Sequence, residues 1–231
     1  MIWDMNYLDA SLVTEKNLED KEFSLYNKIE EFAQVIKGNP TDILFAKSLD
    51  FESKRSLNQD QMIGLQWKTK MGFSSPAITE NFKSQFFPSF DFENKVRAGS
   101  ALISRMELKE KGDLYFFEKK GSNWFERQFS PIPFFQGVRA LVGEDSYWIL
   151  QFQGNNTESQ EYSSFIQKWI KEKQSLNENI LVIAGNIEVV EGFKKVEDLP
   201  LQINSNLNIE EVKEIKVKIS KASPLWVRLS F

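Results

Sequence analysis

The spacing of apolar residues predicts two long helices. Over residues 18–37 apolar side chains recur at the three- and four-residue spacing of one helix face: Leu18, Leu25, Ile29, Phe32 and Ile36. Over residues 158–176 a second stripe recurs in the same way: Tyr162, Phe165, Ile166, Trp169 and Ile170. Thr157 and Gln160 form a capping box in front of this second stripe. We therefore expect two amphipathic helices, the second with Trp169 buried.

Between the two helices the apolar period changes to that of strands. Short turn sequences at residues 111–113, 120–122 and 143–145 divide this part of the chain. The expected strands cover residues 101–109, 114–119, 123–129, 138–142 and 147–153. The apolar run of residues 180–184 follows the second helix, which favours an inner strand reached by a right-handed crossover. The simplest arrangement of the five central strands is a continuous antiparallel meander.

Outside this central region the strand pattern is weaker. Alternating apolar residues predict strands at residues 215–219 and 225–229, and a short strand at residues 62–68. No linker or repeat divides the chain, so we expect a single domain over residues 1–231 with a weak boundary near residues 94–99. The prediction is an α+β protein: an antiparallel β-meander of about five strands with two main helices and C-terminal strands.

The composition excludes several kinds of chemistry. The 231 residues contain no histidine and no cysteine. This excludes Ser–His–Asp triads, histidine or thiolate zinc sites and cysteine nucleophiles. A net charge of −4 argues against a general polyanion binder. No nucleotide-binding glycine motif is present, and we expect no cofactor.

The N-terminal residues and the short apolar runs bear on location. Residues 1–6 contain an early acid and no basic or long apolar stretch that would serve as a signal peptide. The apolar runs are far shorter than the roughly 20 residues of a membrane span. We therefore expect a cytoplasmic protein that does not contact a membrane.

Carboxylate chemistry remains open. Asp91 precedes Glu107 and Lys109, where two carboxylates would hold Mg²⁺ while the lysine orients a water molecule beside a phosphate. Acid-x-lysine triplets also recur elsewhere among the 33 acidic residues, as in any charged chain. A carboxylate-dependent metal nuclease is therefore an alternative function rather than the main interpretation.

Phenylalanine is unusually abundant, with 20 residues. Five lie in one short segment that also contains a proline: Phe82, Phe86, Phe87, Phe90 and Phe92. Phe134 and Phe135 form a second group after Pro131 and Pro133. Prolines disfavour regular central strands, and aromatic residues are enriched where proteins meet. We therefore interpret Phe82, Phe86, Phe87, Phe90, Phe134 and Phe135 as residues that bind a protein partner, with core burial as the alternative.

Residues 106–117, 124–127 and 146–150 together show a strand, a short turn and a tryptophan-bearing strand. In this order they resemble a small accessory subunit family of type III CRISPR effector complexes. The resemblance is confined to these three stretches. It implies a non-catalytic subunit that contacts other proteins of an RNA-guided assembly, so nucleic acid would be bound only within the complex.

Taken together, these features favour a binding or assembly subunit of a larger intracellular complex rather than an enzyme. The alternatives are the accessory subunit of an RNA-guided complex and the metal nuclease. No catalytic residue and no metal ligand is assigned in the main interpretation.

Overall fold

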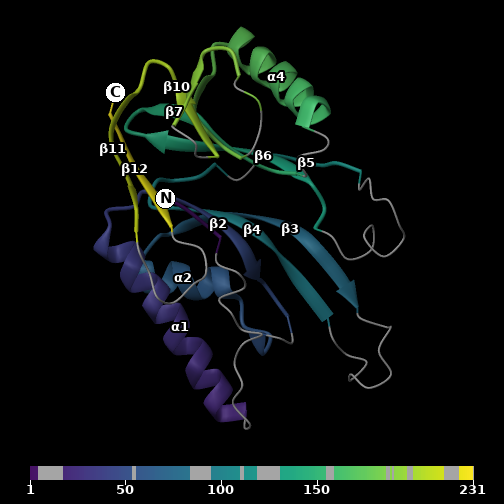
Figure 1. Cartoon of the computed structure of the whole chain (residues 1–231), viewed down its shortest axis with the longest axis vertical. Helices are drawn as coiled ribbons and strands as arrows, with labels where there is room; N and C mark the ends of the chain where they lie inside the picture. Colours follow the sequence, from purple (N-terminus) through teal and green to yellow (C-terminus); the bar gives the residue numbers. More distant parts are fainter. Residues whose placement is uncertain are drawn as a thin grey trace. The chain divides into compact units, whose positions relative to one another are not determined.

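The computed structural model describes residues 1–4, 18–53, 56–83, 95–109, 112–118, 131–154, 159–185, 188, 190–196, 200–215 and 224–230. Within these ranges the chain forms three helices and two six-stranded sheets, so the fold is mixed α and β as predicted (Figure 1). The chain divides into two compact units. Unit 1 comprises Met1–Arg105 and Lys213–Trp226, and unit 2 comprises Met106–Val212 and Val227–Phe231.

The first sheet has the strand order β11-β12-β1-β2-β4-β3. Its strands are β1 Ile2–Asp4, β2 Ile43–Asp50, β3 Phe73–Lys83, β4 Lys95–Ser104, β11 Asn208–Glu214 and β12 Leu225–Ser230. β1 and β2 pair in parallel, whereas β4 lies between β2 and β3 and is antiparallel to both. The chain therefore enters this sheet at its middle and adds strands on both sides.

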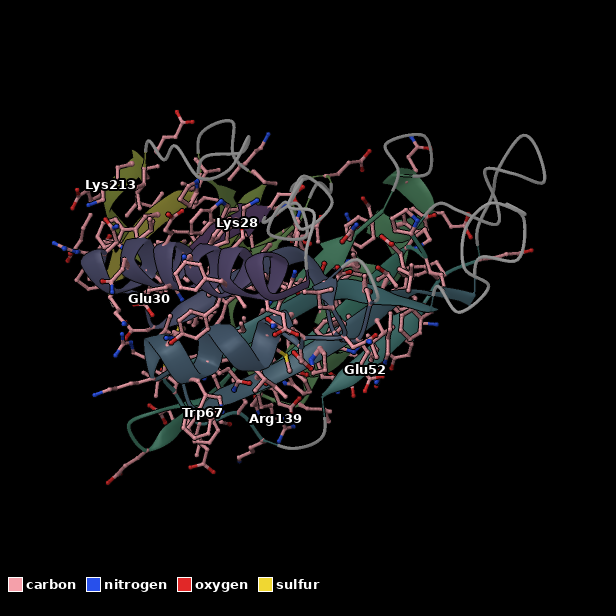
Figure 2. All side chains as sticks on the ribbon, turned by 90° about the horizontal axis from the view of Figure 1, so that it is seen from below. Lys28, Glu30, Glu52, Trp67, Arg139 and Lys213 are labelled. Carbon is pink, nitrogen blue, oxygen red and sulfur yellow. The ribbon has the colours of Figure 1, made fainter. Side chains whose placement is uncertain are left out.

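Two helices cover one face of the first sheet, α1 Leu18–Gly38 and α2 Gln61–Thr69 (Figure 1). Leu25, Ile29, Phe32 and Ile36 of the α1 stripe are buried as predicted. Phe32 stacks on Trp3 of β1 with ring centroids 4.5 Å apart. Lys68 of α2 forms an ion pair with Glu30 of α1, Nζ to Oε2 2.8 Å, where Figure 2 shows Glu30 on the side of α1 next to α2. Apolar packing holds both helices against the sheet, and the ion pair joins the helices to each other.

The second sheet has the strand order β5-β6-β7-β8-β10-β9. Its strands are β5 Asp113–Phe116, β6 Phe134–Val142, β7 Asp145–Gln153, β8 Asn179–Ala184, β9 Phe193–Lys195 and β10 Leu201–Asn204. Helix α4, Ser159–Ser175, connects β7 to β8, which pair in parallel. Both the helix and the inner strand after it are confirmed, and Trp169 is 5% exposed.

The prediction of a single five-stranded meander is wrong. Of the predicted meander strands that the structure describes, only those corresponding to β5, β6 and β7 are consecutive antiparallel neighbours. The segment predicted as the first meander strand ends at Ser104 as β4 and belongs to the first sheet. Its partners are β2 and β3, so it does not form a hairpin with β5. The predicted strand at residues 123–129 lies outside the described residues.

The prediction of a strand at residues 62–68 is also wrong, because these residues form α2. Asp60 has an extended backbone and its side chain accepts a hydrogen bond from the Ile63 amide, which is an N-cap. Lys70 closes the helix in the left-handed conformation, φ 59°. A short apolar run does not distinguish a helix from a strand, and here the capping residue decides.

The predicted strand at residues 225–229 is present within β12. β11 ends at Glu214, and residues 216–219 lie outside the described residues. Among the described helices, none combines the length and the apolar character that a membrane crossing requires.

Candidate active site at the carboxyl ends of β1 and β2

A charged pair lies where β1 ends and its parallel pairing with β2 stops. Asp4 of β1 is the register partner of Lys47 of β2. Asp4 is exposed and Lys47 is half-buried. Burial lowers the pKa of the Lys47 ammonium below its usual value, and the nearby Asp4 carboxylate opposes this shift. Since the carboxyl ends of parallel strands commonly carry functional groups, this edge is the first candidate site.

Two bulges lie near this edge, one in β2 and one in β3, and both are next to Gly99 of β4. In β2 the register shifts between Ala46 and Leu49, and in β3 it shifts between Ile78 and Glu80. Leu49 and Ile78 are both partners of Gly99. A bulge adds one residue to a strand and turns the following side chains to the other face of the sheet.

The backbone at these bulges is unusual at two positions. Ser48 has φ 55°, a conformation that residues with a side chain rarely adopt. A Cβ atom on Gly99 would lie 2.1 Å from the Ala77 carbonyl oxygen and 2.8 Å from the Thr79 nitrogen. β3 therefore reaches this level only because β4 has no side chain there, and such strained positions concentrate at functional sites.

After the bulges, Asp50 of β2 and Glu80 of β3 both pair with Ala98 of β4. Register partners share a sheet face, so the two carboxylates flank one small side chain, with Cα atoms two strand spacings or roughly 10 Å apart. Leu49 and Phe51, on either side of Asp50, belong to the core under α1 and α2. Asp50 and Glu80 therefore lie on the face away from these helices.

Both carboxylates are buried, Asp50 completely and Glu80 to within 9% exposure, and both make further interactions in the structure. Buried acids need such partners, and they are uncommon outside structural networks and functional sites. Glu80 keeps a small exposed surface, whereas Asp50 has none.

The loop after β2 holds Asp50 in place. The Asp50 amide donates to the Gln61 side-chain oxygen at 2.9 Å. The Phe51 amide donates to the Arg97 carbonyl at 2.8 Å, and the Ser53 hydroxyl accepts from the Arg97 amide at 3.1 Å. These contacts tie the end of β2 to α2 and to β4, which fixes the backbone at Asp50.

The sequence-predicted nuclease residues do not meet at this site. Glu107 and Lys109 are both exposed, and their backbone groups pair with β6, where Glu107 accepts from the Leu141 amide at 2.9 Å. Asp91 lies outside the described residues. In the described ranges no group of three or more acidic side chains is positioned to hold a metal ion.

Two of the phenylalanines assigned to a partner surface lie in the core of unit 2. Phe134 and Phe135 are 1% and 0% exposed in β6, and Phe135 packs edge-on against Trp169 with ring centroids 5.1 Å apart. Pro131 and Pro133 precede β6, so they do not interrupt it. The side chain of Phe82 and all of Phe86, Phe87 and Phe90 lie outside the described residues.

Sequence reasoning missed Asp4, Lys47, Asp50 and Glu80. One signal was available, because Asp50 is the last residue of β2 and an acid at the end of a buried strand is a candidate ligand. Glu80 had no such signal, since its orientation depends on the bulge in β3.

No protein-family model matches the sequence, and no curated protein matches it either. Solved structures do. The endonuclease/exonuclease/phosphatase from Bacteroides vulgatus superposes with a TM-score of 0.62 at 9% identity, over 99% of this chain and 97% of that chain. TDP2 from D. rerio, humanized by 14 mutations, gives a TM-score of 0.59 at 8% identity, over 100% and 97%.

The chain has the fold of the endonuclease/exonuclease/phosphatase proteins. TDP2 from Caenorhabditis elegans is also similar, with a TM-score of 0.50 at 13% identity over 84% of this chain. This chain spans about half of that protein, 51% of its length.

These similarities correct the main interpretation of the sequence. A non-catalytic assembly subunit is the wrong reading, and so is the expectation that the chain is not an enzyme, because the structures that share its fold are enzymes by name. The comparisons favour the alternative, a carboxylate-dependent metal nuclease, over the main interpretation. The residues proposed for that alternative, Glu107 and Lys109, are not the ones that unit 1 gathers at the ends of its strands.

Proposed function

We propose that the chain hydrolyses phosphoester bonds with the help of a divalent cation, through the acids that flank Ala98. The shared fold with proteins named as nucleases and phosphatases supports the reaction class. The observation that carries the proposal for this chain is the pair Asp50 and Glu80, which two bulges turn to the same face of one sheet.

The acids suit a hard cation. Mg²⁺ is commonly bound by one or two carboxylates and completes its coordination with water and substrate phosphate. Asp50 and Glu80 provide two carboxylates on the same sheet face, on either side of the small side chain of Ala98. Bound there, Mg²⁺ would polarise a phosphoryl oxygen and lower the pKa of a water molecule.

The remaining residues have separate roles. Glu80 is the more exposed of the two acids, and the buried Asp50 has its backbone amide bonded to Gln61. The Lys47 ammonium would bind a phosphate oxygen, and a phosphate beside it would raise the pKa that burial has lowered. With no histidine in the chain, we assign any proton transfer at this site to a carboxylate or to Lys47.

The test is hydrolysis of bis(p-nitrophenyl) phosphate and of p-nitrophenyl phosphate by the full chain, with Mg²⁺, with Mn²⁺ and with EDTA. Activity on the diester indicates a phosphodiesterase, and activity on the monoester indicates a phosphatase. We expect Glu80→Gln and Asp50→Asn to lower the rate by roughly 100-fold or more, because each removes one cation ligand.

Glu30→Gln is the matched control, since Glu30 is an acid of the same unit on the surface of α1. It should leave the rate unchanged, and circular dichroism should show all three variants folded. A full chain with no metal-dependent activity on either ester overturns the proposal. So does activity that survives Glu80→Gln intact.

A further inference from the structure

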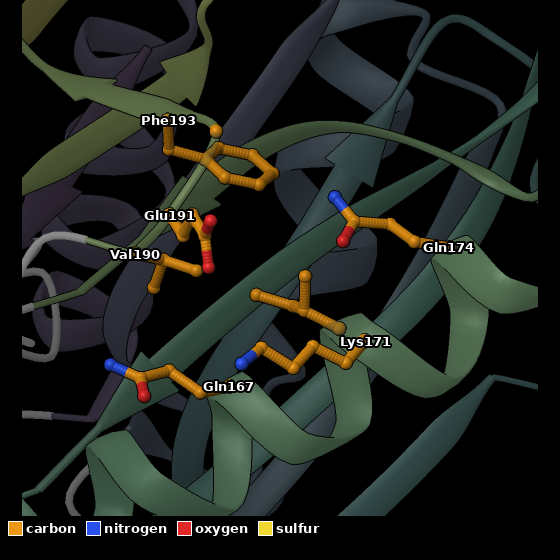
Figure 3. A pocket seen from close by; sticks show the side chains of 8 residues that line it. Gln167, Lys171, Gln174, Val190, Glu191 and Phe193 are labelled. Atoms are coloured by element: carbon orange, nitrogen blue, oxygen red, sulfur yellow. The ribbon is translucent and has the colours of Figure 1, made fainter.

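A cavity of about 420 Å³ lies within unit 2, between α4 and the turn that precedes β9. Figure 3 shows the side chains of α4 on one side and those of the turn on the other. The lining residues are Gln167, Ile170, Lys171, Gln174, Val190, Glu191, Gly192 and Phe193. The volume falls within the range of small-molecule sites, roughly 300–1,000 Å³.

The floor of the cavity is apolar. Ile170, Val190 and Phe193 are 1%, 2% and 6% exposed, and all three belong to the core of unit 2. Their rigid positions give the cavity a fixed base against which a small apolar group would pack.

The turn that forms one wall is held from several directions. The Val190 amide donates to the Gln202 side chain at 2.9 Å, and the Phe193 amide donates to the Val190 carbonyl at 3.0 Å. Gly192 has φ 83°, and its carbonyl accepts from both the amide and the hydroxyl of Ser205, at 3.0 and 2.9 Å. The wall is therefore a formed part of the fold.

The rim carries one charge of each sign. Lys171 on α4 and Glu191 in the turn are both exposed, and Figure 3 shows them on opposite sides of the cavity. Among the described residues no ion pair or hydrogen bond joins either of them to another residue. Gln167 and Gln174 also line the cavity from α4, and their amides supply both donors and acceptors.

From this arrangement we infer that the cavity binds a small zwitterion with an apolar group, namely an amino acid or a short peptide. Its carboxylate would pair with Lys171, its ammonium with Glu191, and its apolar group would rest on Ile170 and Phe193. Opposite charges on two walls above an apolar base match this class of ligand better than a simple anion, which Glu191 would repel.

The experiment measures binding by nuclear magnetic resonance titration of the full chain with four probes. L-leucine and L-leucyl-L-leucine carry both charges and distinguish an amino acid from a peptide. N-acetyl-L-leucine lacks the ammonium and L-leucinamide lacks the carboxylate. We expect each blocked probe to bind roughly fivefold more weakly than leucine, as a partly exposed charge pair contributes.

Variants assign each charge to its partner. Glu191→Gln should no longer distinguish leucine from N-acetyl-leucine, and Lys171→Gln should no longer distinguish leucine from leucinamide. Lys168→Gln, an exposed lysine of α4 outside the cavity, is the control and should bind all probes as the native chain does.

Equal binding of charged and blocked probes overturns the inference, as does absence of binding by both zwitterions. A lower melting temperature for Lys171→Gln and Glu191→Gln without any effect on binding would also overturn it, since the two groups would then serve only to pair with each other.

Discussion

Asp50 and Glu80 lie on opposite sides of β4 and share Ala98 as register partner. Each reaches this position through a bulge in its own strand, and both bulges fall at the level of Gly99. Without its bulge, either acid would occupy the opposite face of the sheet and point into the core under α1 and α2. The acidic pair therefore depends on two irregularities of the sheet and on the glycine between them.

Gly99→Ala should destabilise the chain strongly. The added methyl group would lie 2.1 Å from the Ala77 carbonyl oxygen, which is backbone and cannot move aside without shifting β3. We expect a loss of about 3 kcal/mol or more in the free energy of unfolding, or failure to fold, measured by chemical denaturation.

Gly72→Ala is the control for this substitution. An alanine methyl at Gly72 would have no atom within 4 Å. We expect a change within about 0.5 kcal/mol. Equal stability of the Gly99 and Gly72 variants would show that β3 does not approach β4 as closely as described.

Lys47→Met should change how stability depends on pH. Burial lowers the pKa of Lys47 in the folded chain, so between that pKa and the unfolded value of about 10.4 the unfolded chain binds more protons. The free energy of unfolding therefore rises with pH across this alkaline window. The methionine variant should show a smaller rise and should be at least as stable at pH 7.

The measurement is denaturant unfolding at several pH values from neutral to alkaline, compared with Lys37→Met on the exposed end of α1. The other lysines contribute equally to both variants. Identical pH profiles for the two variants would contradict the buried position of Lys47.

The helices and the site differ in how far sequence could predict them. The stripes of α1 and α4 depend on neighbours three and four residues apart, so the pattern alone located both. β4 was assigned to the wrong sheet because the pattern placed it beside the strands that follow it. Its actual partners, β2 and β3, precede it in the sequence, and α2 lies between them.

The acidic pair could not be predicted from the sequence pattern, again because it depends on how strands pair. The strand period predicts which face a side chain occupies only while the register is regular. Bulges in β2 and β3 reverse that face for Asp50 and Glu80. The close approach of Gly99 to Ala77 beside these bulges is a contact between two strands, β4 and β3, which a pattern along one strand does not reveal. The absence of histidine and cysteine, by contrast, limited the chemistry from composition alone.

Asp60 provides a test of the α2 cap. Its carboxylate accepts from the Ile63 amide at 2.9 Å, and burial is the main cause that raises its pKa above the usual value. Asp60→Ala should lose about 1 kcal/mol with the cap. Asp60→Asn keeps an acceptor oxygen and removes the buried charge, so it should retain most of the stability.

The two Asp60 variants also differ from the native chain with pH. Because the folded pKa lies above the unfolded one, native stability falls as pH rises from the unfolded value of about 3.9 through the folded value. The asparagine variant lacks this decrease, so its stability relative to the native chain should increase across the same window. Unfolding curves at acidic and neutral pH check this, and a constant difference would contradict the raised pKa.

Trp169→Ala should be the most damaging single truncation on α4. The indole is 5% exposed and packs edge-on against Phe135 and Trp148, with ring centroids 5.1 and 5.0 Å away. Its Nε1 donates to Asp113 Oδ2 at 2.8 Å, which ties α4 to β5. Losing both the ring and this bond should lower the free energy of unfolding by about 3–5 kcal/mol.

Two further variants separate packing from the hydrogen bond. Trp169→Phe keeps an aromatic ring and removes the donor, and Asp113 retains Lys173 as a partner at 3.1 Å, so the loss should be only about 1–2 kcal/mol. Trp67→Ala removes an indole that is 82% exposed on α2, and should change stability by less than about 0.5 kcal/mol. If Trp169→Ala cost no more than Trp67→Ala in the same denaturation experiment, the indole of Trp169 would have to be exposed, and α4 would not pack on the second sheet through this face.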